Sequence, residues 1–472
     1  MNKVYQEYFD LYGFESEEIE KEFSRIEKAF KRMRVTEKDL EICTKRIRES
    51  LDISLVGMRQ ILQILFKEMI NLVMAGEEYE KIVYITLPGW GGAFVAPIME
   101  VEPKIYGQCV DMLTAIALYP LFNKQVDCLE AGEKYLPAGN IHCAGFRTLL
   151  GAMDLDIFAK PDLLISWGTY CDEGPKVSAY IAEKYDIPIV YVDEYQDFPS
   201  VENFPLPRWV NFVAVEMQKA FKEIEKLLGI EIPEDVLMKT MMSVSGPHDD
   251  FAAIQQMMLE SDPVPLGIAD LMYAFTLQAL TCSPENEKLK IKALKILRKE
   301  VKRRVKQGEG PLKKGLPRII DTVPSFSDPT SNHLFYECGL QVAGTDMAIY
   351  PPDASALPDL EGCNDFYTYV AKTIMAIPAS AGVAVRKLVL SAIVRKYKID
   401  GIILDPSYSC RPGFADCQIM RNFVEKELHV PVMIMEHDCY DPRFITPGQV
   451  RTRIETFAEQ VRVYKATKDL EN

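Results

Sequence analysis

Apolar residues recur every three or four positions through the first part of the chain, which is the spacing of an amphipathic helix. One such stripe runs along an otherwise charged segment and consists of Ile19, Phe23, Ile26, Phe30 and Met33. A second stripe spans residues 40–51, and residues 55–74 are apolar on most sides, which predicts a buried helix. We therefore expect residues 1–80 to form a helical arm that packs on the first domain.

After residue 80 the pattern changes to short apolar runs that end at Pro, Gly or Asp and alternate with helical stretches. Such runs are typical of strands in a parallel sheet that is covered on both faces. The predicted strands lie within residues 81–87, 161–171, 187–193, 318–323, 340–346, 401–405 and 430–436. The predicted helices among and after them are residues 209–228, 367–375, 383–397, 414–428 and 447–464.

The order of these elements predicts two related α/β domains joined by helices. Residues 232–307 read as almost entirely helical and interrupt the alternation of strand and helix. We predict a helical arm (1–80), a first α/β domain (81–230), a helical linker region (231–314) and a second α/β domain (315–472). A chain of 472 residues is too long for one compact core, which agrees with this division.

Composition and charge exclude several classes of protein. With 48% hydrophobic and 26% charged residues, the chain resembles ordinary globular proteins. Its net charge of -15 argues against a sequence-independent grip on nucleic acid, which depends on a surplus of Lys and Arg. The longest apolar stretch, residues 373–394, is broken by Pro378, Arg386 and Lys387, so we expect no membrane span. Because residues 1–19 lack a secretion signal, we expect a cytoplasmic protein.

Three of the eleven cysteines share one kind of setting. Cys143 stands just before a helical run, while Cys171 and Cys410 each follow a predicted strand and a short loop and precede a helix. Backbone amides and the helix dipole favour a thiolate at such positions. The chain contains no CxxC, so any metal site has to collect its ligands from distant loops.

These three cysteines suggest the ligands of one iron-sulfur cluster. Three thiolates can hold a 4Fe-4S cluster by three of its irons and leave the fourth iron open. Because Cys143, Cys171 and Cys410 come from both domains, they can meet only if the ligand crevices of the two sheets face one another. The alternative is that each is a buried thiol, which is common for free cysteine.

Other residues near these cysteines carry two interpretations each. Cys417 and Cys439 could add ligands for a larger double cluster, or could be buried thiols. His142, beside Cys143, could donate a proton or hydrogen-bond to cluster sulfur. His437 could line the site as a second catalytic residue, or could serve as a loop or cap residue.

Two further segments have possible roles in binding. Residues 88–92 form a glycine-rich loop whose spacing fits neither the dinucleotide nor the Walker pattern, which favours a tight turn in which Trp90 could stack on an acyl or adenine group. A basic run consists of Lys302, Arg303, Arg304 and Lys306. Such a run is usually a solvated helix face, but it could also bind a coenzyme A phosphate.

Five segments together resemble the 2-hydroxyacyl-CoA dehydratase and benzoyl-CoA reductase family: IHCAGFR, PDLLISWGTYC, KIDGIILDPSYSCRPGF, VPVMIMEHDCYDPRF and QVRTRIETFAEQV. The resemblance implies two flavodoxin- or Rossmann-like domains and a 4Fe-4S cluster on Cys143, Cys171 and Cys410. It also implies a related second cluster subunit or a homodimer, an ATP-hydrolysing iron-sulfur activator, and an acyl-CoA substrate. Where this chain has DEGPK after Cys171, the better-known members have an aromatic-rich helix start.

The resemblance leaves three functions open. Residues 306–312 and 318–339 are similar to the cluster subunit of benzoyl-CoA reductase, so we expect reduction of an aromatic acyl-CoA. The alternative is 2-hydroxyacyl-CoA dehydration through a ketyl radical, in which the open iron takes the hydroxyl as a Lewis acid. Residues 409–412 and 441–443 are shared with the dehydratase large subunit. The third possibility is a double-cubane-cluster (8Fe-9S) reductase of small molecules or an electron-transfer subunit.

Overall fold

A computed structural model describes most of the chain. The described residues are 2–86, 92–137, 142–168, 171–193, 207–245, 247–323, 328–346, 363, 365–375, 382–444 and 447–471. Trp90 lies outside them, so its predicted role near the site stays a prediction. No helix in these ranges has both the length and the apolarity needed to cross a bilayer.

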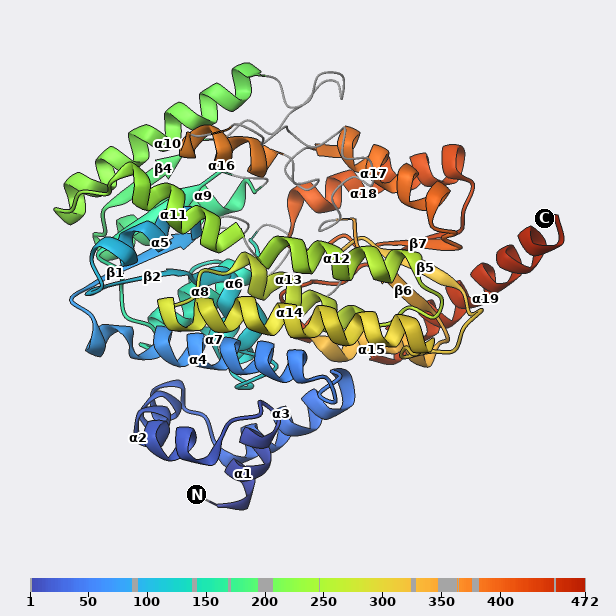
Figure 1. The fold of residues 1–472 in the computed structure, drawn as a ribbon, viewed down its shortest axis with the longest axis horizontal. Coiled ribbons are helices and arrows are strands. Elements are labelled where there is room, and N and C mark those ends of the chain that lie inside the picture. The colour runs from blue at the N-terminus through green and yellow to red at the C-terminus, as the bar shows by residue number, and fades with distance from the viewer. Residues whose placement is uncertain are drawn as a thin grey trace.

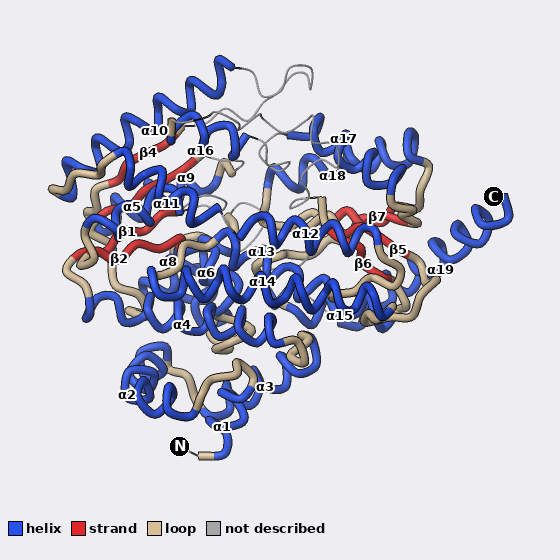
Figure 2. Tube along the Cα trace, viewed as in Figure 1, coloured by secondary structure: helices blue, strands red, loops and turns tan. Residues whose placement is uncertain are grey.

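Two four-stranded parallel sheets form the centre of the fold, and they appear as two separate groups of red strands in Figure 2. Sheet A has the order β2-β1-β3-β4 and contains β1 (Lys81–Thr86), β2 (Ile105–Cys109), β3 (Leu163–Trp167) and β4 (Ile189–Val192). Sheet B has the order β6-β5-β7-β8 and contains β5 (Arg318–Asp321), β6 (Gln341–Gly344), β7 (Gly401–Leu404) and β8 (Val432–Ile434). The predicted α/β class with two parallel sheets is confirmed.

Both sheets have the same internal order: the second strand, then the first, third and fourth. This is the flavodoxin-like order, in which ligands bind at the carboxyl ends of the first and third strands. In sheet A, β1 lies between β2 and β3, with Ile85 opposite both Cys109 and Ile165. In sheet B, β5 lies between β6 and β7.

Helices cover the two sheets, which explains why the strands are apolar on both faces. For sheet A, α4 (Val56–Glu78) and α10 (Pro207–Leu228) lie on opposite sides in Figure 1. Three more helices contact the strands of sheet A: α5 (Gly92–Val101), α6 (Val110–Ala117) and α9 (Glu173–Tyr185). Two others, α7 (Gln125–Gly132) and α8 (Ala144–Asp154), pack on each other, and α8 also packs on α6 and α9. The helices of the sheet B half are α15 (Pro329–Glu337), α16 (Phe366–Met375), α17 (Gly382–Lys396), α18 (Arg411–Phe423) and α19 (Pro447–Glu471). Among these, α16 packs against α10 of the sheet A half.

The N-terminal region and the segment between the sheets are helical. The first contains α1 (Lys3–Asp10), α2 (Ser16–Met33), α3 (Glu37–Ser50) and α4, and the second contains α11 (Glu234–Ser245), α12 (Pro247–Glu260), α13 (Ile268–Ala279) and α14 (Pro284–Gln307). Helix α14 packs along α4, and α13 contacts α6 on one side and β6 and α15 on the other. The two halves therefore share one helical layer, visible across the middle of Figure 1. We propose that the chain divides at residues 80, 230 and 314.

Strand β2 was missed from the sequence because its five residues, IYGQC, contain Gly107 and the polar Gln108. Both residues have a packing reason. A Cβ atom at Gly107 would come within 2.7 Å of Val95, so only glycine fits without a shift. The Gln108 side chain is fully buried and donates to Glu68 Oε2 at 3.1 Å.

Helix α18 begins at Arg411, three residues before the predicted start. Proline is tolerated in the first turn of a helix because its missing N–H has no partner there, so Pro412 does not delay the start. Cys410 is therefore the N-cap residue of this helix.

Candidate active site

The three predicted cluster cysteines all stand at the beginning of a helix. Cys143 is the N-cap residue of α8, and Cys410 is the N-cap residue of α18. Cys171 comes just before Asp172, the N-cap residue of α9. The first-turn amides of these helices have no partner within the helix, so they can donate to a sulfur atom.

A glycine in the first turn supplies such an amide to each cysteine. Gly174 donates its N–H to Cys171 Sγ at 3.2 Å, and the amides of Gly145 and Gly413 donate to Cys143 and Cys410. A Cβ atom at Gly413 would lie 3.3 Å from Cys410 Sγ, tighter than most real contacts. Glycine therefore leaves room beside the sulfur atom.

All three cysteines line one pocket between the two sheets. Its other lining residues include Asp111 after β2, Val323 after β5 and Cys439 after β8. Since these residues follow strands of both sheets, the carboxyl edges of the sheets meet at this pocket. The empty volume is about 1180 Å³, counting the part open to solvent.

Burial keeps these thiols protonated when no metal is bound. It raises the pKa of Cys171 to about 12 and raises the pKa values of Cys143 and Cys410, while the glycine amides act in the opposite direction. A metal ion that binds such thiols displaces their protons.

The three thiols of the pocket are the kind of ligand that an iron-sulfur cluster uses. In the described part of the chain, no three His, Cys, Asp or Glu side chains stand close enough to bind one metal ion. Cysteines that ligate different irons of a cluster do not have to meet that condition, because each binds its own iron. The pocket offers three thiols at three helix N-termini, which is the donor set that such a cluster uses.

A carboxylate links residues that adjoin the cysteines. His142 Nδ1 lies 2.6 Å from Glu173 Oε1, and Arg411 Nη2 lies 2.7 Å from Glu173 Oε2. Arg411 Nη2 also lies 3.0 Å from Asp172 Oδ2. The Glu173 side chain is only 6% exposed, while that of His142 is 30% exposed. A hydrogen bond from one side and ion pairs from the other therefore join the Cys143, Cys171 and Cys410 loops.

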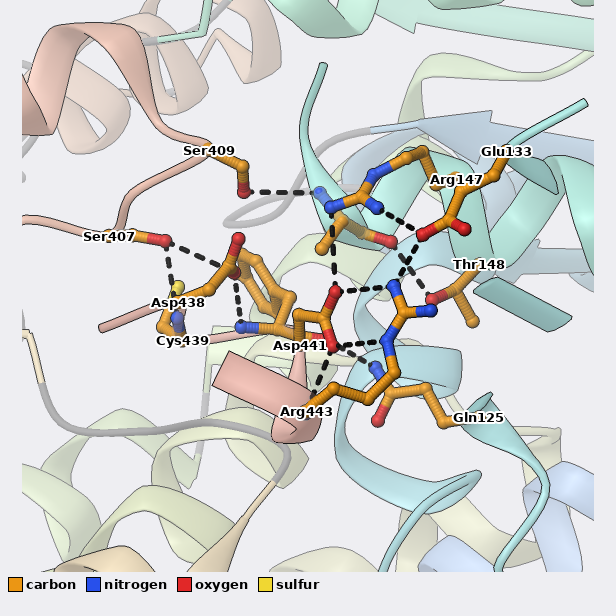
Figure 3. Close-up of polar contacts among 12 residues, drawn as sticks. Gln125, Glu133, Arg147, Thr148, Ser407, Ser409, Asp438, Cys439, Asp441 and Arg443 are labelled. Carbon is orange, nitrogen blue, oxygen red and sulfur yellow. Dashed lines mark hydrogen bonds and ion pairs between the residues drawn. The ribbon is translucent and has the colours of Figure 1, made fainter. Parts of the chain in front are cut away.

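A second polar network joins helix α8 to the loop after β8 (Figure 3). The fully buried Arg147 donates from Nη1 to Glu133 Oε1 at 2.9 Å, and its Nη2 lies 3.6 Å from Asp441 Oδ2. Arg443 binds both Asp441 and Glu133. Nearby, the Ala144 amide donates to Ser409 Oγ at 3.1 Å. These contacts hold the N-terminus of α8 against the sheet B half.

A family comparison agrees with this geometry. The family described as 2-hydroxyglutaryl-CoA dehydratase, D-component, matches residues 108–461, which is most of the chain. The chain belongs to this family. All three cysteines, both interdomain networks and the whole of sheet B lie within the matched residues of the D-component family.

Three proteins are similar to this chain. The alpha subunit of (R)-2-hydroxyglutaryl-CoA dehydratase from Acidaminococcus fermentans is 22% identical over 305 residues, 63% of this chain and 60% of that protein. One of the subunits of benzoyl-CoA reductase from Thauera aromatica is 21% identical over 321 residues, 64% and 70% of the two chains. The alpha subunit of (R)-2-hydroxyisocaproyl-CoA dehydratase from Clostridioides difficile is 23% identical over 333 residues, 67% and 76%. Because the three identities are nearly equal, they do not show whether this chain is more similar to the dehydratases or to the reductase.

His437 is not among the residues that line the pocket with the three cysteines. Its side chain is buried, and Nδ1 pairs with Asp405 Oδ1 just after β7. Burial works against protonation of the ring, but Asp405, with Asp321 and Asp438 nearby, outweighs it and raises the pKa of His437 to about 9. Burial also raises the pKa values of Asp321 and Asp405. His437 is not among the residues that line the pocket, and its catalytic role stays a prediction.

The remaining predicted residues fall in different places. Cys439 lines the pocket with the three predicted ligands, whereas Cys417 lines a smaller neighbouring cavity with Asp405. The basic run lies on α14, where Lys302, Arg303 and Lys306 are exposed and Arg304 pairs with Asp52. None of these four basic residues lines the pocket.

Sequence reasoning missed Glu173 and Arg411 as members of the site. A signal was present, because Cys171 is followed by two acidic residues and Cys410 by a basic one. Opposite charges beside two cysteines that share one site predict a salt bridge. Arg386 was also missed, although it lines the pocket while pairing with Asp346 at 2.9 Å.

Proposed function

We propose that this chain is the iron-sulfur subunit of an oxygen-sensitive, ATP-activated enzyme that acts on CoA thioesters. The observation that carries the proposal is the meeting of Cys143, Cys171 and Cys410 at one pocket between two sheets. In the proposal these residues hold one 4Fe-4S cluster. When bound, such a cluster supplies one-electron reduction and, at an iron without a cysteine, a Lewis acid.

Apolar side chains give the pocket room for an acyl group. Met112, Phe146, Phe275 and Val323 line it beside the cysteines. They keep water away from the reacting part of a thioester, which strengthens the electrostatic interactions there. Two aromatic rings, Phe146 and Phe275, also offer faces or edges on which an aromatic acyl group can pack.

His142 is the proposed proton carrier. Like His437, it is not among the residues that line the pocket, but it adjoins Cys143 and contacts Glu173, which do line it. Glu173 holds its Nδ1, so Nε2 is the ring nitrogen left to exchange a proton with substrate. A histidine whose other nitrogen is held by a carboxylate keeps one ring orientation. The side chain is partly exposed, so protons can reach it from solvent.

Two reactions fit this site. Reduction of an aromatic acyl-CoA is supported by the aromatic lining and by the similarity to the benzoyl-CoA reductase chain of Thauera aromatica. Dehydration of a 2-hydroxyacyl-CoA is supported by the family description and by two of the relatives named above. We propose reduction first and dehydration as the second candidate.

The relatives are named as subunits, which supports a partner for this chain. We propose a related second cluster subunit, with a homodimer as the alternative. An ATP-hydrolysing iron-sulfur activator would deliver the electron. An electron-transfer subunit without a substrate of its own is disfavoured by the apolar pocket beside the cysteines.

The test is iron and acid-labile sulfide analysis with EPR, on anaerobically purified protein and on Cys143→Ala, Cys171→Ala and Cys410→Ala. We expect about four iron and four sulfide per chain, lost in each variant. Cys417→Ala, in the same fold but outside the pocket, serves as the control and should keep its iron. Folded protein without iron, or variants that keep it, would overturn the proposal.

The same preparation separates the candidate reactions. About eight iron per chain that fall on replacing Cys439 would indicate the double cluster instead. For a four-iron protein, assays with its partner and activator on benzoyl-CoA and on 2-hydroxyacyl-CoA thioesters decide between reduction and dehydration.

A further inference from the structure

We infer that Glu173 is a positioning residue that fixes the three cysteines relative to one another. The inference rests on the proposed function, because it concerns the residues that would hold the cluster. Glu173 lies two positions after Cys171 and pairs with His142 and Arg411, the direct neighbours of Cys143 and Cys410. One side chain is thus connected to all three cysteine loops.

The burial of this carboxylate supports a specific role. Glu173 is the first residue of α9, and its side chain is 6% exposed. A buried carboxylate is costly unless it is paired and hydrogen-bonded. Here each oxygen has its own partner, His142 Nδ1 at 2.6 Å and Arg411 Nη2 at 2.7 Å. The helix N-terminus adds a favourable dipole.

The contacts also cross from one half of the molecule to the other. His142 and Glu173 belong to the sheet A half, while Arg411 opens α18 in the sheet B half. Arg411 is covalently joined to Cys410, so its contact with Glu173 restrains the chain directly beside Cys410. Metal sites need their ligands held to within about 0.5 Å, which requires supporting residues of this kind.

The chain contains a matched carboxylate whose partners are not sequence neighbours of a cysteine. Glu133 also pairs with one residue from each half, Arg147 on α8 and Arg443 after β8. None of these three residues adjoins a cysteine. Glu133→Gln therefore weakens a contact between the halves through side chains that are not sequence neighbours of a cysteine, which makes it the control for Glu173→Gln.

The experiment compares the unaltered chain, Glu173→Gln and Glu133→Gln after anaerobic reconstitution with iron and sulfide. It measures iron and sulfide per chain, the rate of iron release to a chelator, and the EPR line shape. We expect Glu173→Gln to release iron about 10- to 100-fold faster, as is typical when a residue that supports a metal ligand is lost. Its line shape should change, whereas Glu133→Gln should match the unaltered chain in both.

Arg411→Lys is a second variant that tests the same contact if Glu173→Gln does not fold. Lysine keeps the charge but replaces the planar guanidinium, whose Nη2 contacts both Asp172 and Glu173, with a compact ammonium group. We expect a smaller rise in the iron-release rate and the same direction of change in the EPR line shape. Thermal unfolding of the iron-free forms shows whether each variant is folded.

The possible outcomes separate this inference from the proposed function. If the unaltered chain binds iron and Glu173→Gln matches it in release rate and line shape, the inference alone is overturned. Equal losses in Glu173→Gln and Glu133→Gln would likewise overturn it, because the effect would then come from loosening of the two halves. Unaltered protein without iron would overturn the proposed function, and the inference with it.

Discussion

The two sheets have the same strand order but end in different chemistry. In sheet A, β1 ends at Thr86, whose hydroxyl lies 2.7 Å from the hydroxyl of Ser178. In sheet B, β5 ends at Asp321 and β7 is followed by Asp405, which pairs with His437. All of these side chains are buried. A neutral pair therefore stands at the end of one sheet, where an ionisable cluster stands at the end of the other.

The comparison shows that topology fixes where a site can form but not which groups fill it. After the third strand of each sheet the chain places a cysteine at a helix start, Cys171 in one half and Cys410 in the other. The charged groups behind them are not repeated. Burying carboxyl groups is costly, so the sheet B cluster depends on His437 much more than the sheet A pair depends on either hydroxyl.

The largest effect should follow from removing His437. His437→Gln leaves Asp405 and the nearby Asp321 buried without the positive partner. Breaking a buried ion pair in this way costs about 3–5 kcal/mol. We expect that loss in the free energy of unfolding at pH 6.5, measured by urea unfolding followed by circular dichroism.

An exposed histidine of the same half is the control for this variant. His429 ends the turn after α18 with a φ of 54°, a conformation that asparagine also tolerates. His429→Asn should change the free energy of unfolding by no more than about 0.5 kcal/mol. If the two variants lower the free energy of unfolding equally, the sheet B cluster contributes no more to stability than an exposed residue. The comparison between the sheets would then fail.

The pH dependence of stability should differ between the sheets as well. The pKa of His437 is raised from 6.5 to about 9 in the folded chain. A histidine whose pKa is raised by folding stabilises the fold. This stabilisation is fully present below the pKa of the unfolded chain and is lost as the pH rises through the pKa of the folded chain. The stability difference between the unaltered chain and His437→Gln should therefore shrink from pH 6.5 to pH 9.

The size of this second effect follows from the shift in pKa. Each pKa unit corresponds to about 1.4 kcal/mol, so the change across this range is on the order of 3 kcal/mol. Urea unfolding at a series of pH values measures it. A difference that stays constant or grows with pH would show that the Asp405–His437 pair is not ionic in the folded chain.

Most of the fold could be predicted because its elements are long or strongly patterned. Helices α2, α3 and α4 and seven of the eight described strands follow the periodicity of apolar positions. Strand β2 was not predicted, because Gly107 and Gln108 owe their places to Val95 and Glu68, which are distant in sequence. Helix α1 was also missed, and its eight residues are held by the burial of Tyr8 and Phe9.

The candidate site divides in the same way. The setting of Cys143, Cys171 and Cys410 before helices is local, so the sequence alone could indicate it. The bridge made by Glu173 joins residues 31 and 238 positions apart, and periodicity carries no information at that range. The burial of His437 against Asp405 depends likewise on the pairing of β7 with β8.

The smallest effect should come from the sheet A pair. Ser178→Ala leaves the buried Thr86 hydroxyl without that partner, at a cost of about 1–3 kcal/mol. Replacing both, with Thr86→Val added, should restore much of the stability because no polar group is then left unpaired. Urea unfolding of the two single variants and the double variant gives the coupling between the hydroxyls.

Neither hydroxyl titrates between pH 6.5 and pH 9, so the coupling should be constant there. A coupling that falls with pH, as expected for Asp405 and His437, would mean that the two sheet ends are not as different as their side chains indicate.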